Sequence, residues 1–231
     1  MLISIIIPVY NERENLLKNL SSLNEQANKF PLEIIVSNSP ETTDDSQKIC
    51  IGFDKVSCYL SNKKGRAEQM NYGASKAKGT VLLFLHADVS LPKDFYLCIK
   101  TAIDSGFKAG FFCYKFDDNR FLLRINSSFT KKDGFFAGGG DQCLFFLKET
   151  FRKLRGFNTQ FCIMEDFELI DKVRKLKIPY TIIQSPVLVS ARKYKANSWL
   201  RVNSVNGYMF LNYKFGRSPE KLVKIYRKWL K

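Results

Sequence analysis

Acidic side chains stand at two places where the sequence pattern predicts that a strand ends or a helix begins. Asp88 directly follows the apolar run 81–85, and Glu165 and Asp166 open a segment with helical spacing. Asp88 could bind a divalent cation shared with substrate phosphates, or it could cap a helix beginning near Pro92. Asp166 could act as a general base, or both acids could simply interact with the helix dipole.

Two further segments and the single histidine of the chain could contact a ligand. Arg66 lies in the first turn of a predicted helix, where backbone N–H groups attract anions, although an ordinary solvated first turn is an equal alternative. The segment 138–142 has three successive glycines, which suit either a close approach to a ligand or a plain hairpin connection. His86 could bind a metal ion or could be a satisfied residue at a strand end.

Alternating apolar strands and amphipathic helices would position these residues. Strands are expected at 3–9, 32–37, 55–60, 81–85, 111–116, 180–190 and within 134–146. Helices are expected from the cap Asn11 to Ala27 and at 65–77, 91–103, 149–154, 165–176 and, twice, after residue 197. Strands apolar on both faces, alternating with such helices, predict an α/β fold with a mainly parallel sheet covered on both sides. The less regular second half adds at least one antiparallel strand.

The carboxyl ends of these strands should form the binding site. Ligands bind there in open α/β sheets, beside the point where the strand order reverses. The polar residues that follow the strands are 10–12, 38–39 and 86–88. We therefore expect these three segments to line one crevice.

Length and composition fit one globular domain with an extension. The 231 residues carry 37 Lys and Arg against 22 Asp and Glu, a formal charge of +15 that favours anionic partners. We expect a domain over 1–196, with a nucleotide-binding half at 1–90 and an acceptor-binding, catalytic half at 91–196. A basic, aromatic helical extension would follow at 197–231. Scattered cysteines, no signal-peptide core and no run of about 20 apolar residues predict a cytoplasmic protein.

Taken in order, these segments resemble the family 2 glycosyltransferases with the GT-A fold, a Rossmann-like three-layer sandwich. Residues 4–12 look like the opening strand of that family, and 86–88 stands where its D-x-D metal motif falls. Glu165 and Asp166, with Leu169, are similar to its E-D-x-x-L base motif.

The match is closest to a bacterial subgroup, some of whose members are described as arsenosugar biosynthesis glycosyltransferases. Its motifs are G-R-A-x-Q-M-N-x-G-A, L-F-L-H-A-D, G-D-Q, M-E-D-x-E-L and S-A-R. They occur here at 65–74, 83–88, 140–142, 164–169 and 190–192. The resemblance runs nearly from end to end of the chain.

The resemblance implies a metal-dependent, inverting transferase of the hexosyltransferase type that moves a sugar from a nucleotide-diphosphate donor to an acceptor hydroxyl. Asp166 would be the catalytic base, with Glu165 beside it. Asp88, and more weakly His86, would hold Mg²⁺ or Mn²⁺. The UDP- or GDP-sugar donor would contact Pro8, Tyr10, Glu12, Asn38, Arg66, Asn71, Ala87, Asp88 and Arg192. The sugar or the acceptor would contact Gly140, Asp141 and Gln142.

Three departures from the family pattern affect these expectations. Asn38 replaces the usual aspartate that accepts a hydrogen bond from uracil, so a preference for UDP does not follow. The segment 37–46 is one residue longer than usual and contains Pro40. His86 replaces the first acid of the metal motif, a change that the subgroup shares, so fewer carboxylates would hold the metal.

Partners and alternatives remain open at this point. The acceptor is unknown, a lipid-linked hydroxyl included, and the basic aromatic extension suits an anionic membrane at its inner face or a helical cover with a solvated outer side. The chain has no recognised nucleic-acid motif, and we expect no nucleic-acid partner. The alternatives are a catalytically degenerate GT-A-fold binding protein, favoured by Asn38, and a nucleic-acid-binding protein, favoured by the charge.

Overall fold

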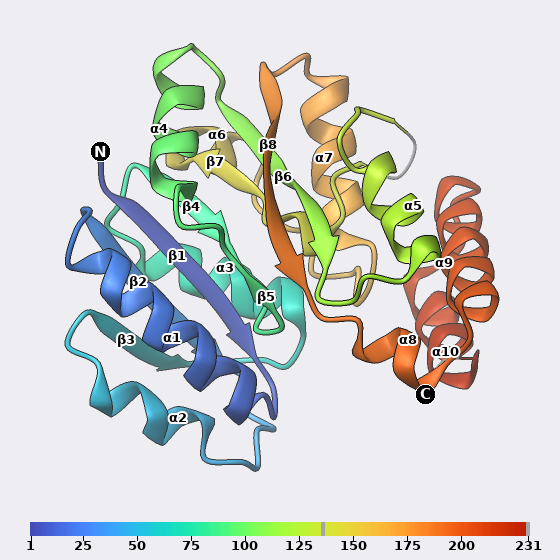
Figure 1. Ribbon diagram of the computed structural model, residues 1–231, viewed down its shortest axis with the longest axis horizontal. Helices are drawn as coiled ribbons and strands as arrows, with labels where there is room; N and C mark the ends of the chain where they lie inside the picture. The colour runs from blue at the N-terminus through green and yellow to red at the C-terminus, as the bar shows by residue number, and fades with distance from the viewer. Residues whose placement is uncertain (135–136, 230–231) are drawn as a thin grey trace.

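The computed structural model describes residues 1–134 and 137–229, the side chains of Glu220 and Arg227 excepted. Residues 135–136 of the region expected to hold a strand, and residues 230–231 of the predicted extension, lie outside the described residues. The described residues form a sheet that crosses the whole molecule, with helices on both sides (Figure 1).

The sheet is mixed, as the sequence predicted. Its strands are β1 (Ile3–Val9), β2 (Leu32–Asn38), β3 (Val56–Leu60), β4 (Val81–Phe84), β5 (Val89–Ser90), β6 (Ala109–Phe116), β7 (Phe145–Leu147) and β8 (Tyr180–Val189). They lie in the order β3-β2-β1-β4-β7-β6-β8-β5. The first four in this order are parallel, β7 is antiparallel to both of its neighbours, β6 and β8 are parallel, and β5 is antiparallel to β8.

Helices cover the two faces of the sheet in separate groups. They are α1 (Arg13–Ala27), α2 (Ser46–Ile49), α3 (Arg66–Lys76), α4 (Phe95–Asp104), α5 (Phe121–Phe129), α6 (Lys148–Lys153), α7 (Glu165–Lys175), α8 (Arg192–Ala196), α9 (Trp199–Lys214) and α10 (Pro219–Trp229). One apolar core joins the sheet to α1 and α4, and a second joins it to α3, α6 and α7. The expected three layers are confirmed.

Alternation along β1 explains how one strand serves both cores. Ile5 and Ile7 are fully buried against the α1 side, while Ile6 is fully buried against the α3 side. Each such side chain stabilises the fold by roughly 1.5–3 kcal/mol. Helix α3 approaches very closely, because a Cβ atom on Gly73 would lie 2.6 Å from Ile6 Cγ2. Glycine at this position therefore lets α3 pack directly on β1.

Two cap assignments made from the sequence are wrong. Asn11 does not cap α1: its Oδ1 accepts a hydrogen bond from the backbone N–H of Thr43 at 2.8 Å, which joins the end of β1 to the loop after β2. Helix α4 begins at Phe95, not near Pro92, and Asp94 stands at its N-cap position. Asp88 is therefore not the cap of this helix.

Some elements were not predicted at all. Helix α5 and the short elements β5 and α8 had no assignment, and the expected strand within 134–146 is reduced to β7 at its end. Phe121 and Phe129 of α5 are exposed, whereas Leu123 is buried. This is not the pattern of an ordinary core-facing helix.

The C-terminal helices pack onto the rest of the molecule. Val205 and Met209 of α9 and Leu222 of α10 form an apolar cluster, to which Ile163 and Met164 add from the segment before α7. Figure 1 shows α9 and α10 beside α5 at one end of the sheet. The boundary at 196/197 stays a prediction. In the part of the chain described, no helix is both long and apolar enough to cross a membrane.

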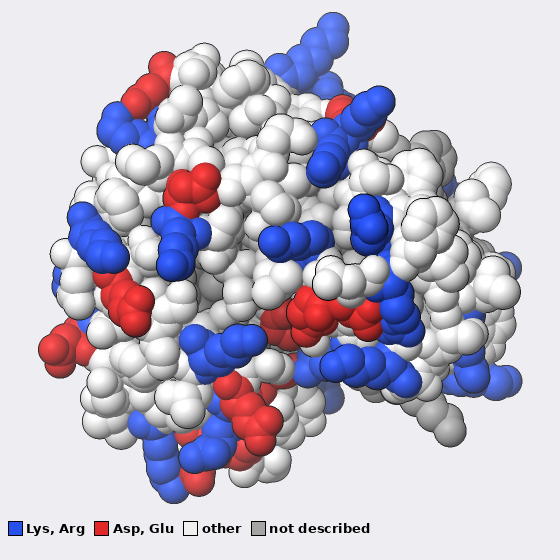
Figure 2. Space-filling model, viewed as in Figure 1, with Lys and Arg blue, Asp and Glu red and all other residues white. Residues whose placement is uncertain are grey.

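Positive charge is spread over the face of the molecule that Figure 2 shows. Figure 2 shows Lys and Arg side chains over most of one face and a group of Asp and Glu side chains near its middle. The net charge of +15 is thus not gathered into a single basic stripe on this face. A stripe of that kind is the usual footprint of nucleic-acid binding.

Candidate functional site

Two adjoining pockets open beside the carboxyl ends of β1 and β4. Their volumes are about 420 Å³ and about 550 Å³. The side chains that line both are Arg66, His86, Tyr114, Asp141, Lys193, Tyr194, Asn206 and Tyr226. Asp88 lines the first pocket and Asp166 the second, so the two predicted carboxylates belong to neighbouring pockets, and the eight shared residues are called the common wall below.

The first pocket brings together most of the predicted donor contacts. Those that line it are Pro8, Tyr10, Glu12, Arg66, Ala87, Asp88 and Arg192. Helix α1 fixes the turn that carries Asp88, because Asn19 Nδ2 donates to the carbonyl oxygens of Ala87 at 2.8 Å and Val89 at 2.9 Å. Nothing in the sequence pattern marked Asn19, since its partners lie about seventy residues away.

Arg192 joins two of the carboxylates that line the first pocket. Its guanidinium donates to Glu12 Oε1 at 2.7 Å and to Glu12 Oε2 at 3.1 Å, and Nη2 lies 3.2 Å from Asp88 Oδ2. Its side chain is 55% exposed, so this pairing contributes little to stability. A cation therefore already sits between Glu12 and Asp88 in this state.

The two acids that open α7 form a buried group with Arg66. Glu165 is fully buried and Asp166 nearly so. Arg66 Nε donates to Glu165 Oε1, and Arg66 Nη2 lies 3.8 Å from Asp166 Oδ2. The guanidinium therefore contacts the acids, where the resemblance implied a contact with the donor.

The environment of Asp166 suits a group that takes up a proton near neutral pH. Burial and the charge of Glu165 raise the pKa of Asp166, Arg66 and His86 oppose the shift, and the resulting pKa is about 7. General bases work best when their pKa lies near the operating pH. The role of Asp166 as a base stays a prediction.

The side chain of His86 is influenced by two acids, Asp141 and Asp166. Its Nδ1 is 3.6 Å from Asp141 Oδ1. Burial and Arg66 lower the pKa of His86, but the contact with Asp141 and the charge of Asp166 outweigh them, so the pKa is raised overall. Burial raises the pKa of Asp141, yet His86 and Lys193 bring it down to about 2.

Gly140 is held in close contact with the same group. A Cβ atom at this position would lie 2.2 Å from His86 Cε1 and 2.4 Å from Asp166 Oδ2. Distances of this kind leave no room for a side chain, so glycine is needed here by the packing of the site itself. The close approach favoured by the glycine run is therefore to the histidine and the acid.

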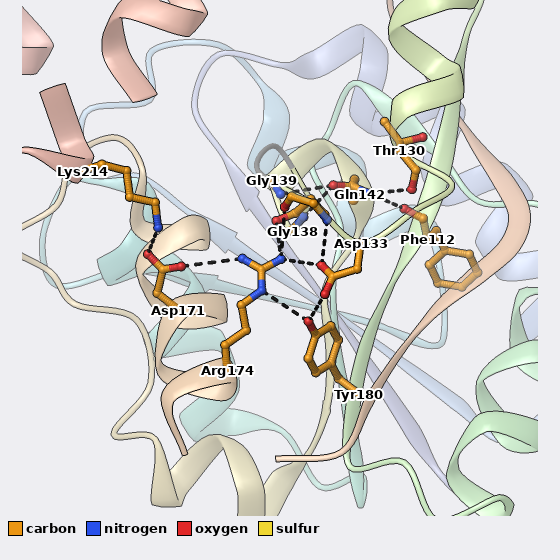
Figure 3. A network of polar contacts seen from close by, with 12 residues as sticks. Phe112, Thr130, Asp133, Gly138, Gly139, Gln142, Asp171, Arg174, Tyr180 and Lys214 are labelled. Atoms are coloured by element: carbon orange, nitrogen blue, oxygen red, sulfur yellow. Dashed lines mark hydrogen bonds and ion pairs between the residues drawn. The ribbon is translucent and has the colours of Figure 1, made fainter. Parts of the chain in front are cut away.

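Gln142 holds the glycine turn in place. Its Oε1 accepts from the N–H groups of Gly138 at 2.7 Å and Gly139 at 3.3 Å, and its Nε2 donates to the carbonyl oxygen of Phe112 at 3.0 Å (Figure 3). Gln142 also lines the second pocket. Because backbone groups occupy its amide, the structure gives Gln142 a structural role beside the predicted contact with the sugar.

Arg174 ties α7 to the same turn. Its Nη2 donates to Asp133 Oδ1 at 2.7 Å and to the carbonyl oxygen of Ala137 at 3.3 Å, and its Nε donates to Tyr180 Oη at 3.3 Å (Figure 3). Asp171, one turn earlier, accepts from Lys214 Nζ of α9 at 2.6 Å. The helix that carries Asp166 is thus braced at its far end.

Two predicted donor contacts do not line either pocket of the described structure. Asn71 Nδ2 donates to the carbonyl oxygen of Phe157 at 2.8 Å, and the Phe157 N–H donates to Asn71 Oδ1 at 2.9 Å. Asn38 is buried, and its Oδ1 accepts from the Thr42 hydroxyl at 2.8 Å. Both amides serve the fold in this state, and Asn71 in particular clamps the segment after α6.

A metal ion would need help from a ligand here. Among the described residues, no group of three or more His, Cys, Asp or Glu could hold an ion. Asp88 and Glu12 share Arg192, and they are hard oxygen donors facing the first pocket. This set fits Mg²⁺ or Mn²⁺ if phosphate oxygens complete the shell, which is the usual way that Mg²⁺ binds. The contacts of His86 are with Asp141 and Gly140, so its part in metal binding stays a prediction.

The second pocket is mostly apolar and is lined in part by the C-terminal helices. Phe129 of α5, Phe167 of α7 and Phe210 of α9 line it, and Phe167 and Phe210 meet edge to face with ring centroids 5.3 Å apart. Asn206 and Tyr226, from α9 and α10, line both pockets. The sequence pattern could not place the extension over the site, because it does not show where α9 turns back.

Comparisons with known proteins agree on one family. The family model described as "Glycosyl transferase family 2" matches residues 4–172. The dolichol-phosphate mannosyltransferase of Pyrococcus furiosus is 29% identical over 109 residues, which cover 46% of this chain and 31% of that protein. The chain thus aligns with about a third of the length of this curated relative.

Solved structures show the same fold at low sequence identity. The mannosyltransferase PcManGT from Pyrobaculum calidifontis, in complex with GDP-Man and Mn²⁺, gives a TM-score of 0.71 at 17% identity over 97% of this chain and 68% of that one. TarS 1–349 from S. aureus, in complex with UDP-GlcNAc, gives 0.68 at 16% identity over 99% and 71%. These likenesses confirm the GT-A fold.

Proposed function

The chain belongs to glycosyl transferase family 2, and from this premise we propose that it transfers a sugar from a nucleoside-diphosphate sugar to an acceptor hydroxyl. The observation that carries the proposal is the common wall between the two pockets, with Asp88 on one side and Asp166 on the other. A donor in the first pocket and an acceptor in the second would meet at this wall.

The first pocket suits the donor. Pro8 and Tyr10 would contact the nucleoside, and Arg192 is placed to exchange its carboxylate partners for diphosphate oxygens, which its planar fork of donors matches. The solved relatives carry GDP-Man in one case and UDP or UDP-GlcNAc in the other. The donor of this chain is accordingly a UDP- or GDP-sugar, and Asn38 leaves the base open.

A divalent cation fits the first pocket together with that donor. When bound, Mg²⁺ or Mn²⁺ would neutralise the charge that develops on the departing diphosphate. Asp88 would hold it, and Glu12 lies next to Asp88 through Arg192. Arg192 would supply the second positive charge on the diphosphate side.

Asp166 would remove the proton of the acceptor hydroxyl as the hydroxyl oxygen attacks the anomeric carbon. Its carboxylate lines the second pocket, on the far side of the wall from the diphosphate pocket. Attack from that side opposes the leaving group and inverts the anomeric configuration. Glu165 pairs with Arg66 and would thereby keep the guanidinium of Arg66 beside Asp166.

A nucleotide screen tests the proposal. UDP, GDP, ADP and CDP are each added with Mn²⁺ or Mg²⁺, and the melting temperature is recorded. A ligand that binds the native state alone must raise it, by an amount equivalent to about 2.7 kcal/mol at 100 times Kd. We expect UDP or GDP to stabilise the chain and EDTA to remove the effect. No stabilisation by any nucleotide would contradict the proposal, and binding without transfer of any sugar would favour the degenerate binding protein.

We also propose that the surface formed by α5, α9 and the segment directly after α9 rests on an anionic membrane. Large apolar side chains are exposed on α5, on α9 and directly after α9, among them Phe121 at 72%, Leu200 at 70% and Phe215 at 84%. Interfacial aromatics combined with a net charge of +15 favour anionic lipid surfaces. The alternative is a helical cover whose outer side is simply solvated.

Co-sedimentation with liposomes decides between these two. The protein should pellet with vesicles of phosphatidylglycerol and phosphatidylcholine at low salt, and less so at high salt or with phosphatidylcholine alone. Replacing Phe121 and Phe215 with serine should reduce the bound fraction, while the control Leu97→Ser, an exposed position on α4, should not. Equal recovery in the supernatant with both lipids would end the membrane proposal.

A further inference from the structure

Lys193 occupies a central place between the two pockets. It is the second residue of α8, directly after Arg192, and its side chain lines both pockets. Its Nζ lies 5.6 Å from the centroid of the Tyr226 ring, which belongs to α10. Helix α10 thus helps to hold the Lys193 side chain in place where the two pockets meet.

The other cations of the site already have carboxylate partners. Arg192 pairs with Glu12 and Asp88, and Arg66 pairs with Glu165 and Asp166. Among the residues whose side chains the structure describes, no carboxylate lies within ion-pair distance of Lys193. Burial lowers the pKa of Lys193, but Tyr226 and Asp141 raise it overall, so the side chain is a cation at neutral pH. Asp141 acts on this half-buried cation only from beyond ion-pair distance, so the ammonium group can still bind an anionic ligand group directly.

The pocket beside Lys193 has the composition of a site for an apolar body. Ile125 and Phe129 come from α5, and Trp199 and Phe210 come from α9. Its volume of about 550 Å³ is within the range for a small organic ligand. Asp166 lies in the same pocket. One molecule could therefore place an apolar part among the aromatics, an anion on Lys193 and a hydroxyl at Asp166.

We propose that the acceptor is an amphiphile with an apolar body and an anionic group, a phosphate or carboxylate, and that Lys193 recognises the anion. This inference rests on the proposed function and names the chemical class of the acceptor. Lys193 acts as a specificity residue, because its charge would discriminate between acceptors that share one apolar body. Nothing in this role requires contact with the donor.

Matched amphiphiles test the inference. Binding of 1-decylglycerol 3-phosphate and of neutral 1-decylglycerol is measured by calorimetry below their micellar concentrations, with and without UDP or GDP and Mn²⁺. The wild-type chain should bind the phosphorylated compound at least tenfold more tightly. Lys193→Gln should abolish this preference and Lys193→Arg should largely keep it. The control Lys195→Gln, an exposed lysine on the same helix, should match the wild type.

Three results would overturn the inference. The first is an unchanged preference in Lys193→Gln. The second is a loss of nucleotide affinity in Lys193→Gln as large as the loss of amphiphile affinity, which would assign the lysine to the donor phosphates. The third is inorganic phosphate alone binding as tightly as the phosphorylated amphiphile, which would remove any need for the apolar body. Failure of nucleotides to bind the wild type would count against the proposed function alone, because the amphiphile preference is also measured without nucleotide.

Discussion

Replacing Asp166 with asparagine should lower the transfer rate by about 10²–10⁴-fold, the usual contribution of a positioned general base. Asparagine keeps the size of the side chain and its place at the start of α7, but it cannot take up the acceptor proton. Because Asp166 lies across the wall from Asp88, binding of the donor nucleotide should change little. Initial rates of sugar transfer and nucleotide Kd values, measured on the same preparation, check both parts.

The pH dependence should report the same residue. Transfer requires the ionised form of Asp166, so kcat/KM should fall about tenfold per pH unit below the pKa of about 7 and level off above it. Since the charge of Glu165 raises the pKa of Asp166, Glu165→Gln should move the midpoint to lower pH. A profile that is flat from pH 5 to pH 8 would contradict the assignment.

The contribution of Asp166 to the stability of the fold should fall as pH rises, whereas its activity as a base should increase. A carboxyl whose pKa is higher in the folded state than its unfolded value of 3.8 binds protons more strongly when folded, so its contribution to stability is lost as pH rises from about 4 to about 7. A tenfold difference in proton affinity between the folded and unfolded states corresponds to about 1.4 kcal/mol. Asp166→Asn should therefore melt higher than the wild type at pH 8 and show a smaller difference at pH 5. The control Asp104→Asn, an exposed acid on α4, should show no such trend.

The second large effect is expected from Asp88→Ala. If Asp88 holds the cation that bridges to the diphosphate, its loss should weaken nucleotide binding in Mn²⁺ by roughly 100-fold or more, and transfer should fall with it. The fold should survive, because Glu12 keeps Arg192 through two hydrogen bonds of 2.7 and 3.1 Å. Asp88→Asn, which keeps the shape without the charge, should behave nearly as badly.

Titration of nucleotide with and without EDTA measures this directly. The control Asp118→Asn removes an acid that pairs with Arg120 outside both pockets, and it should keep full cation-dependent binding. Nucleotide binding by Asp88→Ala that remains as tight and as sensitive to EDTA as in the wild type would show that another group holds the cation.

The fold and the gathering of the acids could be predicted because local patterns determine them. The apolar runs that end at Val9 and Phe84 are strands buried on both faces, and the carboxyl ends of neighbouring parallel strands meet at one edge. Asp88 must therefore lie near Glu12. The helix that starts at Glu165 was equally visible from its spacing.

Several residues of the site make contacts that sequence spacing does not show. Arg66 meets Glu165 across 99 positions of the chain, and Asn71 meets Phe157 across 86. A motif indicates that such residues matter, but it does not show whether they bind a ligand or hold the fold. Asn71 and Gln142 were assigned to ligands, and the structure shows their amides bound to backbone groups.

The sequence also did not show where the C-terminal helices α9 and α10 pack relative to the site. Tyr226 and Asn206 reach the site only because α9 and α10 pack against the segment before α7. Lys193 follows the S-A-R motif directly, yet the motif gave no reason to single it out. Its importance appears only when the carboxylate partners of the other cations are known.

One assay tests most directly whether Asp88 and Asp166 have separate roles. It compares Asp88→Ala with Asp166→Asn and measures both nucleotide binding in Mn²⁺ and sugar transfer. We predict that Asp166→Asn binds the nucleotide like the wild type and does not transfer, and that Asp88→Ala loses both. An Asp166→Asn chain that still transfers sugar at the wild-type rate, or an Asp88→Ala chain with undiminished binding, would contradict a site in which one carboxylate holds the cation and the other takes the proton.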